Sequence, residues 1–187
     1  MQSDDEEIAV MVQGGETESF GILAERYEAK ISRYARRFLF GAEDTKDLVQ
    51  EIFIKAFINI KSFDSGRSFS SWIYRIAHNV FINAIKKNTR EKIQFFDFDL
   101  IFPHPIARET ADGDLNKKEL KNLLDSGLSR LDVKYREVLV LFYIEEKNYK
   151  ETAEILEIPQ ATVGVRLRRG REKLKEIMLK DKKYLSR

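Results

Sequence analysis

The chain has 187 residues, 43% hydrophobic and 11% aromatic, which is enough for one ordinary domain or two small ones with a buried core. It has no cysteine, which excludes disulfides, thiolate metal sites and cysteine nucleophiles and is compatible with a reducing cytoplasm. No apolar run approaches the roughly 20 residues of a membrane span, and the acidic N-terminus is unlike a signal peptide. We therefore expect a cytoplasmic protein without membrane insertion.

The net charge of +2 conceals strong segregation of charge along the chain. Residues 1–30 contain eight acids and two bases, and residues 93–114 contain five acids and one base. Residues 67–92 contain six bases and one acid, and residues 160–187 contain ten bases and three acids. Two basic blocks separated by an acidic one indicate two polyanion contacts on one chain. Chance clustering on solvated helix faces explains the same charges, so the motifs must decide.

Few glycines and prolines interrupt the long mixtures of polar and apolar residues, a pattern typical of helices. The sequence predicts an all-α fold of two small helical domains, residues 1–90 and 115–187. Residues 91–114 lose the helical period and contain Pro103 and Pro105, so we expect a flexible linker there.

The first block has three apolar stripes at helical spacing. The first stripe consists of Phe20, Leu23, Tyr27, Ile31, Tyr34 and Phe38; the second of Leu48, Val49, Ile52, Phe53, Ala56 and Ile60; and the third of Trp72, Ile73, Ile76, Ala77, Val80 and Ala84.

The predicted helix over residues 45–61 has a second, unusual face. At 100° per residue, Asp47, Glu51, Ile54 and Ile58 lie opposite its core stripe. Two isoleucines flanked by carboxylates predict a docking patch for a basic protein partner. Single exposed apolar residues are also common and carry no function.

The predicted helix over residues 70–87 turns Arg75, His78, Ile82 and Lys86 away from its core stripe, with Asn79 on one flank. Amides can read base edges, and basic groups neutralise phosphates. The preceding polar loop, residues 63–69, begins and ends with phenylalanine, which suits capture of an unstacked base. The phenylalanines could equally staple the loop to the core. We expect His78 to be a surface residue rather than a metal ligand.

Residues 149–175 have the pattern of a helix-turn-helix, with a turn near Pro159. On the second helix, Val163, Leu167, Gly170 and Leu174 form the inner stripe. Ala161, Val165, Arg168 and Arg169 point outward, with Arg166 and Arg171 on the flanks. The helix dipole accounts for Lys173 and Lys175 near the C-terminus, but not for arginines on both flanks and at the outer centre. The pattern favours nucleic-acid binding.

Four segments together resemble the extracytoplasmic-function (ECF) sigma factors, the smallest group of the sigma-70 family of bacterial RNA polymerase. They are Ser19-Phe20 with Tyr27, Asp47 to Ala56, Phe69 to Asn79, and Ala161-Thr162-Val163 with Arg169 to Leu174. The resemblance covers nearly the whole chain. It implies an alternative sigma factor that binds core RNA polymerase and directs promoter-specific initiation without being an enzyme.

The resemblance also implies a division of labour. The first domain docks on the polymerase and melts the −10 element, and the second places its outward helix in the major groove of the −35 element. The polymerase-binding residues are Asp47, Gln50, Glu51 and Ile54, to which the outward face adds Ile58. The −10 residues are Lys55, Asn59, Phe63, Asp64, Ser65, Arg67, Ser68, Tyr74, Arg75 and Asn79, to which the outward face adds Lys86. The −35 residues are Gln160, Ala161, Thr162, Gly164, Val165, Arg166, Arg168, Arg169 and Arg171.

Two departures from the family limit this assignment. Glu157 stands at the helix-turn-helix turn where relatives often have glycine or asparagine, and a left-handed backbone there would cost about 1 kcal/mol. Gly164 and Val165 replace residues that tend to be basic or hydroxyl-bearing, so the −35 sequence of relatives does not carry over. The acids of the linker segment Phe95–Asp99 imitate nucleic-acid charge near the polymerase active centre, or its aromatics dock on a domain; both readings remain open.

Two other classes of protein are less consistent with the sequence. If the protein were a stand-alone helix-turn-helix regulator, the motifs within residues 47–79 would have no function, and no effector or dimerisation domain is evident. An enzyme acting on nucleic acid lacks a phosphate-binding glycine loop, and His78 and His104 are far apart. We therefore expect no catalytic or metal-binding residues, no cofactor and no small-molecule substrate. The expected partners are core polymerase, promoter DNA and an anti-sigma factor.

Overall fold

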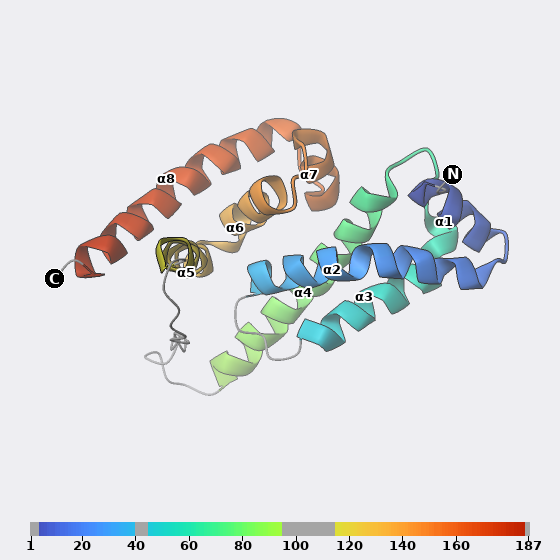
Figure 1. Ribbon diagram of the computed structural model, residues 1–187, viewed down its shortest axis with the longest axis horizontal. Coiled ribbons are helices and arrows are strands. Elements are labelled where there is room, and N and C mark those ends of the chain that lie inside the picture. Colours follow the sequence, from blue (N-terminus) through green and yellow to red (C-terminus); the bar gives the residue numbers. More distant parts are fainter. Residues whose placement is uncertain (1–3, 40–44, 95–114, 186–187) are drawn as a thin grey trace.

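The computed structural model describes residues 4–39, 45–94 and 115–185, and all regular elements in these ranges are helical. The predicted all-α fold is therefore confirmed. The N-terminal unit consists of α1 (Asp5–Gln13), η1 (Thr17–Ser19), α2 (Phe20–Leu39), α3 (Thr45–Asn59), η2 (Ile60–Ser62) and α4 (Phe69–Gln94). The C-terminal unit consists of α5 (Leu115–Ser129), α6 (Val133–Leu139), the π-helical turn η3 (Val140–Ile144), α7 (Tyr149–Leu156) and α8 (Gln160–Leu185). Figure 1 shows the two units side by side.

Two helices begin with reciprocal capping boxes. Asp4 accepts a hydrogen bond from the backbone N–H of Glu7 at the start of α1, and the Glu7 carboxylate accepts from the N–H of Asp4. Asn148 and Glu151 repeat this arrangement at the start of α7. Each box satisfies backbone donors that a helix leaves unpaired at its first turn, so these residues set where the helices begin.

The core of the N-terminal unit is built on the predicted stripe of α2, all six residues of which are buried. They face α3 through Ile52 and α4 through Ile73 and Phe81. The Tyr34 ring lies edge-on to that of Phe81, with 5.2 Å between centroids. Tight aromatic packing therefore fixes the angles at which α3 and α4 present their outer faces.

The end of α4 differs from the sequence-based expectation. Helix α4 continues through Gln94, although its apolar period weakens after about residue 87 and the linker was predicted from Glu91. Residues 95–99, with the acids and aromatics discussed above, lie outside the described ranges. In the C-terminal unit, the chain changes from α to π geometry at Val140, and the backbone N–H of Glu145 donates to the Val140 carbonyl at 3.0 Å.

The C-terminal unit packs α7 and α8 as a helix-turn-helix on α6 and α5. Val163 and Leu167 of the predicted inner stripe are buried. Gly170 lies against Leu139, and Gly127 of α5 lies against Leu174, where an added Cβ would approach the Leu174 side chain to 2.7 Å. These glycines allow α8 to cross its neighbours at close range.

The turn between α7 and α8 has the left-handed backbone anticipated at Glu157, with φ 53° and ψ 43°. Replacement of Glu157 by glycine should therefore raise the free energy of unfolding by about 1 kcal/mol, because glycine adopts this conformation without a steric penalty. The ion pair of Glu157 with Arg75, at 3.7 Å between a partly exposed arginine and an exposed glutamate, offsets little of this gain.

Chemical denaturation of both proteins measures the difference. The matched control is Glu154→Gly, three residues earlier inside α7, where glycine should instead cost about 1 kcal/mol because it loses more conformational entropy in a helix. Equal destabilisation at both positions would contradict the strained-turn explanation.

Candidate nucleic-acid interface

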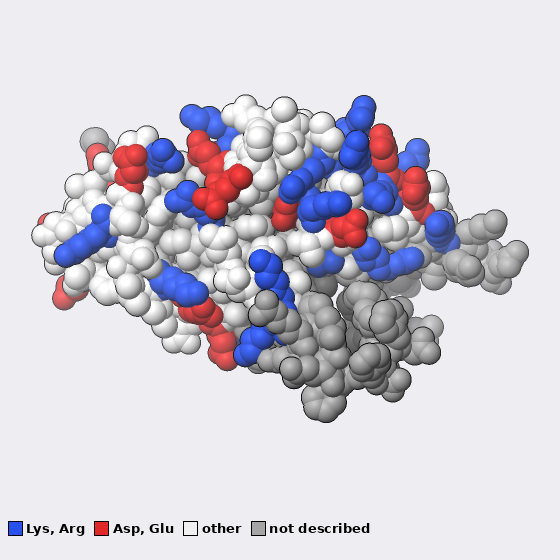
Figure 2. All heavy atoms as spheres, turned by 180° about the vertical axis from the view of Figure 1, so that it is seen from behind, with Lys and Arg blue, Asp and Glu red and all other residues white. Residues whose placement is uncertain are grey.

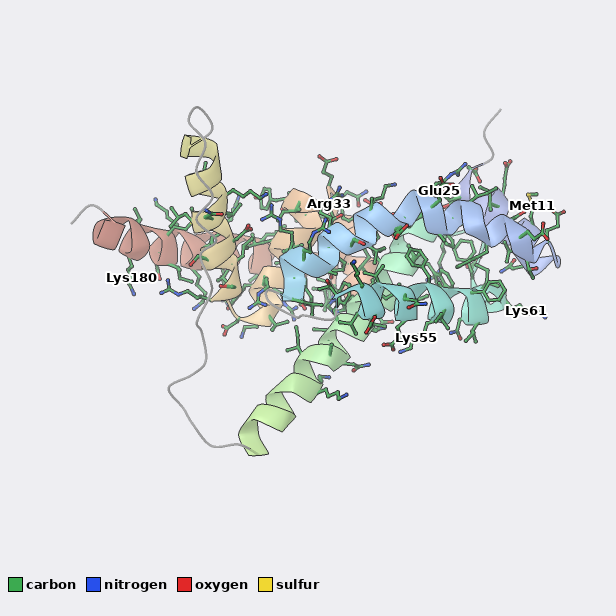
Figure 3. All side chains as sticks on the ribbon, turned by 60° about the horizontal axis from the view of Figure 1, so that its bottom comes forward. Met11, Glu25, Arg33, Lys55, Lys61 and Lys180 are labelled. Atoms are coloured by element: carbon green, nitrogen blue, oxygen red, sulfur yellow. The ribbon has the colours of Figure 1, made fainter. Side chains whose placement is uncertain are left out.

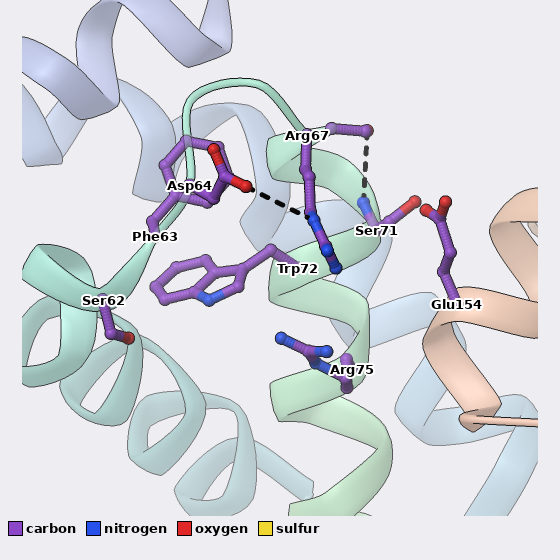
Figure 4. Close-up of a pocket in the computed structure, with 9 residues that line it drawn as sticks. Ser62, Phe63, Asp64, Arg67, Ser71, Trp72, Arg75 and Glu154 are labelled. Atoms are coloured by element: carbon purple, nitrogen blue, oxygen red, sulfur yellow. Dashed lines mark hydrogen bonds and ion pairs between the residues drawn. The ribbon is translucent and has the colours of Figure 1, made fainter.

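A cavity of about 280 Å³ lies at the start of α4 (Figure 4). Its lining comes from the end of η2, the polar loop, the first two turns of α4 and one residue of α7. The lining residues are Ser62, Phe63, Asp64, Arg67, Ser68, Ser71, Trp72, Arg75 and Glu154. Five of them belong to the predicted −10 set, so the structure brings these residues together. The sequence analysis did not assign Ser62, Ser71, Trp72 and Glu154 to this site. Ser71 could have been found, because residues 68, 71 and 75 are spaced to lie on one face of a helix.

Hydrogen bonds from α1 hold the loop in this shape. The Gln13 amide donates to the carbonyls of Ile60 and Phe63, both at 2.8 Å, and Glu6 accepts from the backbone N–H of Phe69 at 2.8 Å. Within the loop, Asp64 accepts from the N–H of Gly66 and pairs with Arg67. Gln13 and Glu6 are positioning residues that the sequence analysis did not find, because they lie about fifty or more residues away from their partners.

Phe63 attaches the polar loop to the core, which was one of the two interpretations of this residue. Its ring is buried and packs edge-on against Phe69 and beside Trp72, with 5.4 Å between centroids in both cases. Phe63 and Phe69 thus have the packing that the stapling interpretation requires, while a role of Phe63 toward a base stays a prediction. Phe63 and Trp72 are the two aromatic residues that line the cavity (Figure 4).

The Ser71 hydroxyl is the unusual group of this cavity. Among the described residues, it is the one buried side-chain oxygen or nitrogen without a hydrogen-bond partner. A buried unpaired hydroxyl costs about 1–3 kcal/mol. Such a group is retained at a cost in stability, and a polar ligand atom in the cavity would satisfy it.

The outward face of α3 lies where its pattern predicts. Ile54 is 52% exposed and Ile58 is 69% exposed, and Asp47 and Gln50 are exposed beside them. Glu51 pairs with Lys55 at 2.6 Å, so one predicted polymerase-binding residue and one predicted −10 residue contact each other. Figure 3 shows Lys55 on α3, away from the C-terminal unit. Asn59 donates its amide to the Lys55 carbonyl at 2.8 Å.

The outward face of α4 is not open to solvent along its length. Asn79 and Lys86 are exposed as expected, but Tyr74 is only 1% exposed and His78 is buried. The prediction that His78 is a surface residue is therefore wrong, because α7 packs on α4 and Glu137 of α6 lies 3.9 Å from the His78 Nε2. Burial lowers the pKa of His78 to about 4, so the ring is neutral at pH 7. Its Nδ1 lies 3.3 Å from the Tyr34 hydroxyl.

The outward face of α8 carries the predicted −35 residues. Gln160, Ala161, Val165, Arg168, Arg169 and Arg171 are exposed, while Thr162, Gly164 and Arg166 are half-buried. The C-terminal unit contributes many of the basic side chains on the face shown in Figure 2.

The four arginines of this helix are not equivalent. Arg166 donates to Glu137 at 2.5 Å, and Arg171 donates to the Tyr143 hydroxyl at 3.1 Å. Burial raises the pKa of Glu137 to about 7, and Arg166 limits the rise. Arg168 and Arg169 have no such partner among the described residues and are free to contact DNA.

Tyr149 is a further aromatic group on this surface. It is half-exposed, and a Cβ added to Gly164 would lie 3.5 Å from its ring. The ring therefore lies beside Gly164, the position at which α8 has no side chain. Spacing along α8 alone gave no signal for this residue, because it belongs to α7.

The described residues contain no group of three or more acidic or histidine side chains able to hold a metal ion. No described helix combines the length and the apolar character of a membrane span.

Comparison with known families agrees with this arrangement of two surfaces. Residues 23–91 match sigma-70 region 2, and residues 121–174 match sigma-70 region 4. The chain belongs to the sigma-70 family. It is similar to the ECF RNA polymerase sigma factor SigW of Bacillus subtilis, with 36% identity over 173 residues, 88% of this chain and 91% of the relative. SigM of the same organism is 34% identical over 75% of this chain and 86% of the relative.

Solved structures show the same fold. The sigma factor resembles CnrH in its complex with the cytosolic domain of CnrY, with a TM-score of 0.69, 27% identity and coverage of 95% of this chain and 98% of that chain. RpoE of Bartonella quintana, in complex with the anti-sigma factor NepR, has a TM-score of 0.68 at 21% identity over 86% of this chain and 97% of that chain. This protein is thus an ECF-type alternative sigma factor that directs promoter-specific transcription initiation.

Proposed function

We propose that this sigma factor captures one unstacked base of the −10 element in the cavity at the start of α4. The observation that carries the proposal is the buried, unpaired hydroxyl of Ser71 in the lining of a cavity that the Trp72 ring also lines. An aromatic wall can stack on any base, and a hydroxyl can donate to or accept from a base edge. Arg67 and Arg75 line the same cavity and are suited to the adjoining phosphates.

We assign polymerase docking to the outward face of α3. Ile54 and Ile58 offer apolar anchors, and Asp47 and Glu51 add negative charge at their edge. An interface with an apolar centre and a charged rim favours a partner with a complementary basic surface. Asp47, Gln50, Glu51, Ile54 and Ile58 therefore form the docking surface for core polymerase.

The −35 element is the target of α8. Arg168 and Arg169 are at the centre of its exposed face, and an arginine bidentate to guanine is the commonest specific contact in the major groove. The protein supplies binding surfaces rather than catalytic groups, and it acts in the cytoplasm, where the polymerase is. It takes no small-molecule substrate.

An anti-sigma factor is a further proposed partner. CnrH and RpoE, the two solved structures that resemble this chain over most of its length, were determined in complex with CnrY and NepR respectively. Such an inhibitor would have to block the polymerase-docking face of α3 or the DNA-binding faces.

The experiment that tests base capture compares a duplex promoter with one whose −10 region is already melted. Ser71→Ala and Asn79→Ala should each reduce open-complex formation by holoenzyme about 10-fold, since each lost base contact is worth about 1–3 kcal/mol. Ser71→Ala should also leave the melting temperature unchanged or raise it, because it removes a buried unpaired hydroxyl. Initial binding to the closed duplex should be unaffected.

Asn83→Ala, one turn further along α4 and also exposed, is the matched control and should behave as wild type. Phe63 is unsuitable as a test because it belongs to the core. If the Ser71 and Asn79 variants lose closed-complex binding as strongly as open-complex formation, the cavity does not hold an unstacked base.

A further inference from the structure

Arg166 of α8 makes a short contact with the neighbouring helix α6. Its guanidinium donates to the Glu137 carboxylate at 2.5 Å. The side chain of Glu137 is 9% exposed and that of Arg166 is 26% exposed, so the contact is largely shielded from water. Hydrogen bonds between an arginine and a carboxylate are strong and directional. The contact therefore ties the second turn of α8 to α6.

A second close approach to α6 lies one turn further along α8. An added Cβ at Gly170 would lie 3.2 Å from the Leu139 side chain and 3.4 Å from the Cβ of Tyr135. Residues 166 and 170 are four positions apart, so they share one side of the helix. A directional ion pair and a close packing contact on the same side together fix the rotation of α8 about its own axis.

The ion pair is internal to the C-terminal unit, so it does not depend on how the two units sit against each other. Burial raises the pKa of Glu137, and the Arg166 guanidinium opposes this rise, so the guanidinium favours the charged carboxylate. The His78 Nε2 lies 3.9 Å from the same carboxylate, but its ring is neutral at pH 7. Removal of the guanidinium would leave the charge of Glu137 buried without this compensation.

The rotation of α8 decides where its outward side chains lie. Arg168 and Arg169 are exposed on that side, whereas the Arg166 guanidinium is engaged with α6. A helix with its side chains has a radius of about 5 Å, so a turn of about 10° displaces its outer edge by about 1 Å. Hydrogen bonds form over a range of only a few tenths of an ångström. A bidentate contact from α8 to guanine therefore requires the helix to be held at one rotation.

We propose that Glu137 is a positioning residue for −35 recognition: it holds Arg166 on α6 and thereby sets the rotation at which α8 presents Arg168 and Arg169 to the major groove. The inference rests on the proposed function, since it requires that α8 reads the −35 element. Arg166 then supports the reading helix from its inner side and is not a phosphate contact. The helical pattern alone places Arg166 on a flank, as it does Arg171, and does not separate the two roles.

The salt dependence of promoter binding separates them. Holoenzymes that carry Glu137→Gln or Arg166→Gln are compared with wild type by promoter-library selection and by promoter affinity over a range of salt concentrations. Each variant should lose about 10-fold in discrimination at the base that Arg168 contacts, because a rotated helix loses the bidentate contact. The slope of the logarithm of affinity against the logarithm of salt concentration should stay at the wild-type value, because no phosphate contact is removed.

Two further variants test whether Glu137 acts through Arg166. Glu137→Gln should have no additional effect on discrimination when Arg166 is already replaced by glutamine. Arg166→Lys keeps a cation within reach of Glu137 and should retain most of the discrimination. Thermal melts set the assay temperature at which every variant is folded. If Glu137→Gln does not fold, Arg166→Gln and Arg166→Lys decide the question through discrimination and the salt slope.

Glu154→Gln is the matched control, with the same change of charge at an exposed residue of α7, and should behave as wild type in both measurements. A salt slope lowered by nearly one in Arg166→Gln would make Arg166 a phosphate contact and overturn the inference. Wild-type discrimination in Glu137→Gln overturns it too, and so does an equal loss in Glu154→Gln. The Arg168→Ala variant judges the proposed function separately. If its base preference is unaltered, α8 does not read the −35 element and both proposals fail; if it is altered while that of Glu137→Gln is not, only the inference fails.

Discussion

Reversal of Asp47 and Glu51 to lysine should weaken binding to core RNA polymerase at least about 100-fold, since truncating buried charge pairs at interfaces commonly costs 2–5 kcal/mol. Both acids are on the outward face of α3, beside the exposed side chains of Ile54 and Ile58. The fold should be unaffected, because Glu51 gives up only an exposed pair with Lys55, and such pairs contribute little to stability. Pull-down with core enzyme and a thermal melt measure the two quantities.

The control for this experiment is a second double reversal, Glu25→Lys with Glu28→Lys. Both residues are exposed on α2 and produce the same change in net charge. The control should therefore bind polymerase with nearly wild-type affinity. If both double variants weaken binding equally, net charge rather than the α3 face is responsible. A large fall in the melting temperature would likewise argue against a docking role.

Arg168→Ala should change which −35 bases matter, with a loss of discrimination of about 5- to 150-fold at one position, the equivalent of 1–3 kcal/mol for a bidentate guanine contact. Arg168 and Arg169 are exposed on α8 and have no side-chain partner among the described residues. Gly164 has no side chain to reach a base, so specificity should be relaxed opposite it. A promoter-library selection with holoenzyme measures the preference at each position.

Arg171→Ala is the informative comparison, because Arg171 is on the flank of the helix and its guanidinium is bound by the Tyr143 hydroxyl. This variant should bind all promoters more weakly by the same factor. The slope of the logarithm of affinity against the logarithm of salt concentration should fall by nearly one, as expected for a phosphate contact. If Arg171→Ala alters base preference and Arg168→Ala weakens every sequence equally, α8 is rotated in the groove relative to our assignment.

Several features of this sigma factor could be predicted from sequence because they depend on local geometry alone. The stripe from Phe20 to Phe38 is buried, and Ile54 and Ile58 are exposed on the opposite side of α3 from Ile52. A helical period determines which residues share a face, whatever the helix packs against. The left-handed backbone at Glu157 was anticipated from the resemblance, because relatives often have glycine or asparagine at this turn.

The cavity and the contact between the two units depended on the tertiary structure. Arg33 of α2 pairs at 2.8 Å with Glu145, 112 residues away, and Gln13 holds a loop about fifty residues away. No period within one helix indicates what covers its outer face, which is why His78 is buried although its helix turns it away from its own core stripe. By itself, the sequence determined the helices, their inner stripes and their resemblance to sigma factors, since these follow from local spacing and motifs. Which outer faces stay open was decided only when the two units packed together, because burial there comes from partners distant along the chain.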